Sequence, residues 1–125
     1  MNNLAGHYEL ISHGVYSSEN VFEETSSYLK GELIYSGEGF LSVQIFFKED
    51  FLTGKDLLAY SGRYKVISNC EVEHHIEICS QSRRNHSVEK RNYIYNNDFL
   101  ILSILYSDES RFEARWKKFY DFKKF

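Results

Sequence analysis

A histidine in residues 70–79 is the side chain best placed to do chemistry. Side chains in this segment alternate in character: glutamates and His75 take one set of positions, and aliphatic residues with His74 take the other. Because a strand points successive side chains to opposite faces, the pattern predicts a β-strand with one wet and one dry face. The dry face is expected to hold Val72, His74, Ile76 and Ile78. A histidine titrates near neutrality, so His74 is a candidate proton donor or acceptor.

Arg91 is the second candidate, in a strand predicted for residues 88–95. One face of this strand would carry Val88, Lys90, Asn92 and Ile94, and the other Glu89, Arg91, Tyr93 and Tyr95. The second face is the more aromatic, so we predict that it points inward. Consecutive strands are usually neighbours, which would bring Arg91 to the same cavity as His74. An arginine there could hold a carboxylate or stabilise an enolate while His74 moves a proton.

Three interpretations of this pair remain open. His74 and Arg91 could be catalytic, they could bind a ligand without chemistry, or they could be structural groups that tie strands together. A buried histidine is costly unless its ring nitrogens find partners, and neighbouring tyrosines could supply them. Alternation places these tyrosines, Tyr60 and Tyr64, on the inward face of a strand predicted for residues 59–67.

Other chemistries find little support. His74 and His75 are adjacent, so in a strand they cannot hold one metal ion together, and no zinc-ligand spacing is present. Cys70 and Cys79 would lie roughly 30 Å apart in an extended strand, too far for a disulfide. Neither cysteine has an identifiable activating partner. The glycines at 37 and 39 indicate a hairpin turn and not a phosphate loop, because no helix follows. We expect neither a metal nor a cofactor.

Composition indicates one domain, residues 1–125, that is long enough to bury its own core. Fifteen basic and eighteen acidic residues give a net charge of −3, which gives no reason to expect nucleic acid or an anionic membrane as partner. Arg83 and Arg84 are expected in a solvated loop. The first residues lack a basic region followed by an apolar run, and no apolar stretch approaches the length of a membrane span. The cytoplasm is the expected location.

The remaining pattern predicts an all-β protein. Short segments of alternating polarity, separated by turns, predict eight strands without a long helix between them. Such a meander favours an eight-stranded antiparallel up-and-down barrel, because closure removes the exposed edges. The strands are predicted at 6–16, 31–35, 40–47, 59–67, 70–79, 88–95, 99–106 and 111–120. Residues 17–25 and 80–87 are expected to be loops, residues 48–58 a helical turn or flap, and residues 121–125 a tail.

Several blocks resemble the bacterial and fungal lipocalin-like domain family, a group of small barrels distinct from the secreted lipocalins. They are the segments 4–12, 31–44, 59–64, 72–77, 89–91 and 112–118. Tyr8 stands where the family usually has Trp, Lys118 stands where Arg is usual, and Trp116 is in place. Residues 82–84, Ser-Arg-Arg, replace a Pro-Asn-Trp type segment that the family commonly carries. The resemblance covers nearly the whole chain.

The resemblance implies a lipocalin-like barrel around a cavity for a small molecule. We expect a largely apolar ligand that carries a carboxylate or carbonyl group. The predicted ligand-binding residues are Tyr35, Gln44, Tyr60, Tyr64, His74, Arg91, Tyr93 and Trp116, with His74 and Arg91 as the catalytic candidates. The place of Trp116 and Tyr8 on the last and first strands, however, favours packing at the bottom of the barrel over stacking on a ligand.

Two alternative functions remain. One is a cofactor-independent isomerase, cyclase or dehydratase of small-molecule (natural-product) biosynthesis, as the resemblance allows. The other is a structural or interaction module whose own aromatic side chains fill the barrel. The volume of the cavity distinguishes the filled barrel from the ligand-binding protein and the enzyme, because ligand sites usually enclose about 300 Å³ or more.

Overall fold

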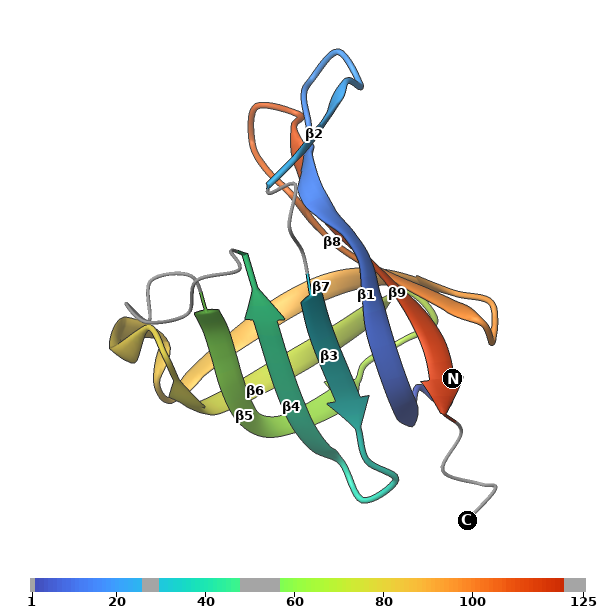
Figure 1. Cartoon of the computed structure of the whole chain (residues 1–125), viewed down its shortest axis with the longest axis vertical. Helices are drawn as coiled ribbons and strands as arrows, with labels where there is room; N and C mark the ends of the chain where they lie inside the picture. Colours follow the sequence, from blue (N-terminus) through green and yellow to red (C-terminus); the bar gives the residue numbers. More distant parts are fainter. Residues whose placement is uncertain (1, 26–29, 48–56, 121–125) are drawn as a thin grey trace.

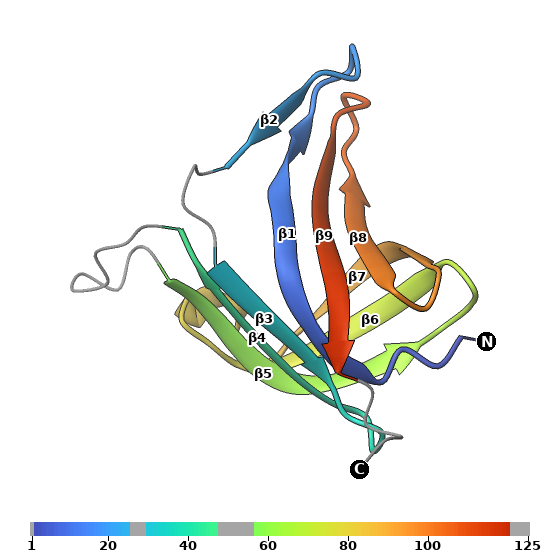
Figure 2. The same ribbon diagram turned by 45° about the vertical axis from the view of Figure 1, so that its right-hand side comes forward.

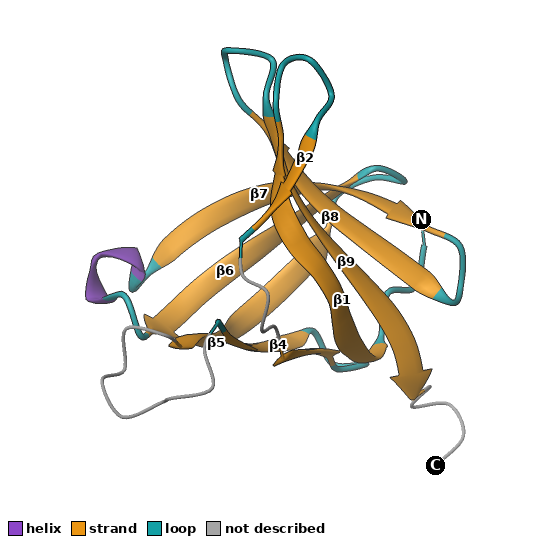
Figure 3. Cartoon of the chain, turned by 45° about the horizontal axis from the view of Figure 1, so that its top comes forward, coloured by secondary structure: helices purple, strands orange, loops and turns teal. Residues whose placement is uncertain are grey.

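The structure, a computed structural model, describes residues 2–25, 30–47 and 57–120. Most of this part of the chain forms strands, and one short 3-10 helix lies between two of them (Figure 3). The elements are β1 (Gly6–Tyr16), β2 (Phe22–Glu24), β3 (Lys30–Tyr35), β4 (Phe40–Phe46), β5 (Leu57–Val66), β6 (Glu71–Cys79), η1 (Ser82–Arg84), β7 (Ser87–Tyr95), β8 (Phe99–Leu105) and β9 (Arg111–Tyr120). Within these described residues, no helix is long and apolar enough to cross a membrane.

The strands form one antiparallel sheet that closes on itself. Consecutive strands pair from β3 through to β9. β1 pairs with β3 on one side and with β9 on the other, which closes the sheet (Figures 1 and 2). The predicted eight-stranded antiparallel up-and-down barrel is therefore confirmed. Closure leaves few strand edges able to pair with another chain, which is the usual advantage of a barrel.

β2 is a ninth, short strand that the sequence did not reveal. It pairs with the far end of β1 over three residues, from Gly14–Glu24 to Tyr16–Phe22. The prediction that residues 17–25 form only a loop is wrong, because β1 continues past the barrel and the chain folds back along it. Figure 1 shows this hairpin rising from the barrel beside the turn that joins β8 to β9. Of the segment predicted as a helical turn or flap, residues 57 and 58 belong to β5, and residues 48–56 lie outside the described residues, as do residues 121–125.

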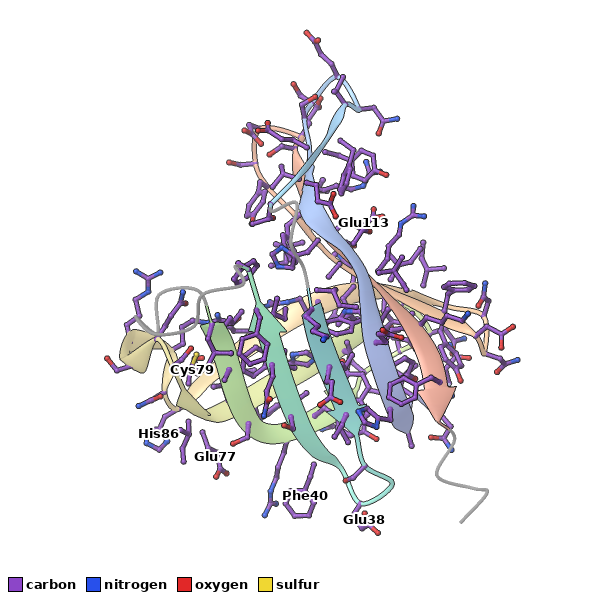
Figure 4. The ribbon with its side chains drawn as sticks, in the orientation of Figure 1. Glu38, Phe40, Glu77, Cys79, His86 and Glu113 are labelled. Atoms are coloured by element: carbon purple, nitrogen blue, oxygen red, sulfur yellow. The ribbon has the colours of Figure 1, made fainter. Side chains whose placement is uncertain are left out.

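An irregularity between β5 and β6 changes which side chains face inward. Gly62 pairs with Ile76, but the preceding residue Ser61 pairs with Ile78, so Glu77 is an extra residue in β6. Such a β-bulge shifts the alternation by one position. Ile76 is 1% exposed, whereas Ile78 is 68% exposed and Cys79 is buried. The prediction that Ile78 faces the core is therefore wrong, and Glu77 points away from the barrel (Figure 4).

Gly62 is needed opposite this bulge. A Cβ atom at residue 62 would lie 2.0 Å from the carbonyl oxygen of His75. The glycine therefore allows the two strands to approach closely, as glycines in strands commonly do.

Large side chains fill much of the barrel. The largest that are fully buried are Trp116, Tyr8, Tyr35, Leu4, Leu33, Ile76, Leu100, His74 and Val72. The Tyr8 hydroxyl donates a hydrogen bond to the carbonyl oxygen of Leu4 at 2.6 Å, which fixes the N-terminal segment against the core. The up-and-down order places this N-terminal segment at the end of the barrel that carries the β3–β4 turn, called here the turn end. The opposite end carries η1 and is called the η1 end.

Candidate functional site

Two tyrosines hold His74 inside the barrel. His74 is on β6 and is 0% exposed. The Tyr60 hydroxyl, from the neighbouring β5, lies 2.9 Å from its Nδ1 atom. The Tyr35 hydroxyl, from β3 across the interior, lies 2.5 Å from its Nε2 atom. The polar ring therefore has a partner at each nitrogen, which meets the requirement that a buried polar group be hydrogen-bonded.

Burial controls the protonation of these three groups. Loss of hydration and, to a smaller extent, the nearby charge of Arg91 together lower the pKa of His74 to about 3. Burial likewise raises the pKa of Tyr35 well above its ordinary value. Burial raises the pKa of Tyr60 to about 12, although the charges of Arg91 and Arg84 act in the opposite direction. At neutral pH the cluster is an uncharged histidine between two uncharged tyrosines.

A second cluster, of charged groups, lies at the η1 end. Glu89 is on β7, two residues before Arg91, and its Oε1 atom accepts hydrogen bonds from Arg91 at 2.6 Å and from Arg84 at 2.7 Å. Its Oε2 atom accepts another from Nε of Arg84 at 2.7 Å, so the pairing with Arg84 is bidentate. Two guanidinium groups thus share one carboxylate, and the cluster carries a net positive charge.

The carboxylate of this cluster is strongly held in its ionised form. Burial acts to raise the pKa of Glu89, but the hydrogen bonds from Arg84 and Arg91 outweigh it and lower the pKa to about 2. The hydrogen bond to Glu89 in turn raises the pKa of Arg84. Glu89 is therefore ionised at neutral pH.

A small cavity joins the two clusters. Its volume is about 50 Å³, and it is lined by His13, Val43, Ile45, Leu58, Tyr60, Arg84, Arg91, Leu102, Phe112, Ala114 and Trp116. Arg84 lies over the Tyr60 ring, with 5.2 Å between its Cζ atom and the ring centroid. This volume is well below the roughly 300 Å³ usual for sites of drug-sized ligands. The cavity has room for a head group of a few atoms.

One polar atom near this cavity lacks a partner. Trp116 is 2% exposed, and its indole Nε1 has no hydrogen-bond acceptor among the described residues. Buried donors are rarely left unpaired, because the lost hydration costs about 1–3 kcal/mol. Trp116 is also one of the residues that line the cavity. An acceptor oxygen bound there could satisfy it.

The predicted site residues are brought together only in part. Tyr60, Arg91 and Trp116 line the cavity, and the predicted inward face of residues 88–95 is confirmed by the buried Tyr93 and the 11% exposure of the Arg91 side chain. His74 and Tyr35 lie behind Tyr60 and do not belong to the lining found among the described residues.

Three further predicted residues lie elsewhere. The Tyr64 hydroxyl donates to the carbonyl oxygen of Ser36, and the Tyr93 hydroxyl donates to that of Ser68. Both bonds tie down turns at the turn end of the barrel. Gln44 is exposed on the outer face of β4, because its neighbours Val43 and Ile45 take the inward positions.

Sequence reasoning missed His13 as a site residue. In the pairing of β1 with β9, Leu10 is opposite Trp116 and Ser12 is opposite Arg115, so Ile11 is an extra residue. This bulge moves His13 into the interior, where its Nδ1 atom lies 2.9 Å from the Thr25 hydroxyl. Burial lowers the pKa of His13 to about 4.

Arg84 and Glu89 were also missed. The prediction that Arg84 lies in a solvated loop is wrong, because η1 turns its side chain back onto Glu89 and leaves it only 19% exposed. The signal that could have found this pair is the position of Glu89 on the same predicted inward face as Arg91. A partly buried carboxylate is costly unless charged or hydrogen-bonding groups pair with it.

Two larger hollows lie on the outside of the barrel. One, of about 470 Å³, lies over β1, β3 and β4 and includes Glu9, Lys30, Glu32 and Gln44, all exposed. The other, of about 320 Å³, follows the outer faces of β4, β5 and β6. Neither gathers buried polar groups, so we place the candidate site in the smaller inner cavity. In the part of the chain that the structure describes, no three metal-binding side chains meet, and Cys70 and Cys79 are both free.

The buried histidines predict that stability depends on pH. In the unfolded chain each has a pKa near 6.5, whereas folding lowers it to about 3 for His74 and about 4 for His13. The unfolded state therefore binds more protons as the pH falls below about 6.5, and the free energy of unfolding should fall with it. The lowered pKa of His74 alone should reduce the free energy of unfolding by about 2 kcal/mol between neutral pH and about pH 5.

Urea denaturation at a series of pH values measures this dependence. His13→Asn should make the decline shallower, and His86→Asn, a change of an exposed histidine in a turn, is the matched control. An equal free energy of unfolding at neutral pH and about pH 5 would contradict the assignment of His13 and His74 as neutral buried groups.

Comparison with known proteins assigns neither a family nor a function to the chain. No protein-family model matches the chain, and a search of curated proteins gives no significant match.

Proposed function

We propose that this barrel belongs to the lipocalin-like domain family and binds a small molecule by a carboxylate or carbonyl group at the η1 end. The main support for this proposal is the net positive charge at the cavity wall. Two guanidiniums, Arg84 and Arg91, share the single carboxylate of Glu89 at 2.6–2.7 Å. A positively charged, partly buried wall favours an anion, and arginine is well suited to bind a carboxylate.

Apolar groups and one unpaired donor complete this site. Apart from its polar residues, the cavity is lined by aliphatic and aromatic side chains such as Val43, Leu102 and Phe112. The indole N–H of Trp116 offers a further donor for an acceptor oxygen. The small volume, about 50 Å³, favours a ligand whose polar head group is short. A largely apolar ligand of drug size would need the interior side chains to move.

The same volume supports a second candidate, a structural or interaction module with a filled barrel. Much of the interior is occupied by the chain's own aromatic residues. The two candidates predict different results when a small carboxylate is added: a ligand-binding cavity should bind it, and a filled barrel should not. An enzyme of the isomerase, cyclase or dehydratase kind would also need to bind its substrate here, so binding is the first property to test.

Titration of the ¹⁵N-labelled protein with acetate tests the proposal. Trp116 is the only tryptophan of the chain, so its indole N–H gives a single, assignable NMR signal. We expect this signal and the Arg91 side-chain signals to shift in a saturable manner with acetate. Acetamide, which has the same shape without the charge, should shift them far less. Identical, unsaturated responses to both compounds would favour the filled barrel.

A further inference from the structure

The two tyrosines that hold His74 cannot play the same role. A neutral imidazole has one N–H donor and one acceptor nitrogen. Both nitrogens of His74 contact a hydroxyl, Tyr35 at Nε2 and Tyr60 at Nδ1. One hydroxyl must therefore donate its proton to the ring, and the other must accept a proton from it. The hydroxyl that accepts keeps its own proton, which then needs an acceptor elsewhere.

Burial decides which hydroxyl donates. Tyr35 is 0% exposed, and its hydroxyl has no other hydrogen-bond partner among the described residues. If Tyr35 accepted from His74, its own proton would be buried without an acceptor, at a substantial cost. Tyr60 differs because it lines the cavity. The arrangement that keeps the Tyr35 proton paired has Tyr35 donating to Nε2 and Nδ1–H donating to the Tyr60 oxygen.

In this arrangement the Tyr60 proton is free to point into the cavity. The other polar groups of the wall are also donors: guanidiniums have no acceptor atom, and an indole nitrogen only donates. The nearest carboxylate, Glu89, already has both oxygens engaged by Arg84 and Arg91. His13, whose ring can donate or accept, is the one lining side chain that does not follow this pattern among the described residues.

We infer that Tyr60 donates a hydrogen bond to the bound ligand, and that Tyr35 and His74 position it by fixing the direction of its hydroxyl. This inference rests on the proposed function and deepens it. Converging donors, with His13 as the one possible acceptor among the described lining residues, favour an oxygen that carries negative charge or a lone pair facing the donors, as oxyanion sites do. The ligand class is therefore a carboxylate or enolate oxygen, and groups that present an N–H to this wall are disfavoured. His74 acts as a positioning residue and does not touch the ligand.

The first measurement needs no ligand. The ¹⁵N chemical shifts of His74 in the free protein distinguish a protonated from an unprotonated ring nitrogen. We expect a protonated Nδ1 and an unprotonated Nε2 at neutral pH. The opposite tautomer, or a doubly protonated ring, would overturn the inference whatever the protein binds.

The second measurement compares two tyrosine variants in the acetate titration. Tyr60→Phe should weaken acetate binding about tenfold, the usual range for a lost hydrogen bond to a charged group. Tyr64→Phe is the matched control, because the Tyr64 hydroxyl donates to the Ser36 carbonyl oxygen at the other end of the barrel. Its affinity for acetate should equal that of the wild type. Thermal melts of both variants confirm that each is folded at the temperature of the titration.

The outcomes separate the inference from the proposed function. Acetate binding that is equal in the wild type and Tyr60→Phe would overturn the role of Tyr60 and leave the arginine site standing. Failure of acetate to bind the wild type would overturn the proposed function and, with it, the ligand contact of Tyr60. A tenfold loss confined to Tyr60→Phe, with Nδ1 protonated in the free protein, supports both.

Discussion

Ile76→Asp is expected to unfold the barrel or to lower its free energy of unfolding by more than about 4 kcal/mol. Ile76 is 1% exposed on β6, beside His74 in the barrel interior. An aspartate there would bury a carboxylate without a positive partner, and it would leave a gap where the aliphatic side chain was packed. Urea denaturation followed by circular dichroism measures the loss.

Ile78→Asp provides the matched control, with the same change two residues later in the same strand. The bulge at Glu77 turns Ile78 outward, where it is 68% exposed. Its substitution should change the free energy of unfolding by no more than about 0.5 kcal/mol. Equal losses for the two variants would contradict the bulge and restore the simple alternation predicted for residues 70–79.

This pair of positions shows how far the pattern of polarity could predict the fold. Alternation predicted the eight barrel strands and the inward faces up to Ile76, because one buried face imposes period two on a strand. It could not predict the extra residues Glu77 and Ile11, which arise where the pairing of two strands shifts. Gly62 allows the two strands to approach closely in the structure, but a glycine in the sequence does not say which partner strand carries the bulge. β2 was missed because only three residues pair.

The position of a site residue could be predicted where the alternation of its own strand determines it. It could not be predicted where the position depends on how several elements meet. The aromatic face of residues 88–95 correctly placed Arg91 inside, and the aliphatic face of residues 70–77 correctly buried His74. Arg84 lies on η1, between β6 and β7, and it reaches Glu89 only because of how the chain turns there, which its neighbours in the sequence do not reveal. Gln44 was expected from the family resemblance, but its own strand alternation points it outward.

Arg91→Gln is the change with the largest expected effect on binding. It removes the guanidinium that lies inside the barrel and donates to Glu89 at 2.6 Å, and the charge of the cavity wall falls from positive to neutral. We expect the dissociation constant for acetate to rise at least about tenfold, because a charged hydrogen bond contributes about 1.5–3 kcal/mol. The acetate titration measures the change, and a thermal melt checks that the variant is folded.

Arg63→Gln makes the same change of charge at a different place. Arg63 is exposed on the outer face of β5, with its Cζ atom 5.4 Å from the centroid of the Phe40 ring. Acetate affinity should be almost unchanged in this variant, because solvent and salt screen a charge on the outside. Similar losses in both variants would mean that acetate responds to the net charge of the protein, and not to a site between Arg84 and Arg91.

We propose above that the η1 end of this barrel binds a small oxygen-bearing anion. A crystal structure of the wild-type protein grown in saturating acetate tests it most directly. We expect a planar density of acetate size in the inner cavity, with its oxygens within hydrogen-bonding distance of Arg91 and Tyr60. A cavity closed by its own side chains, or holding only water in saturating acetate, would contradict an anion site and favour the structural or interaction module with a filled barrel.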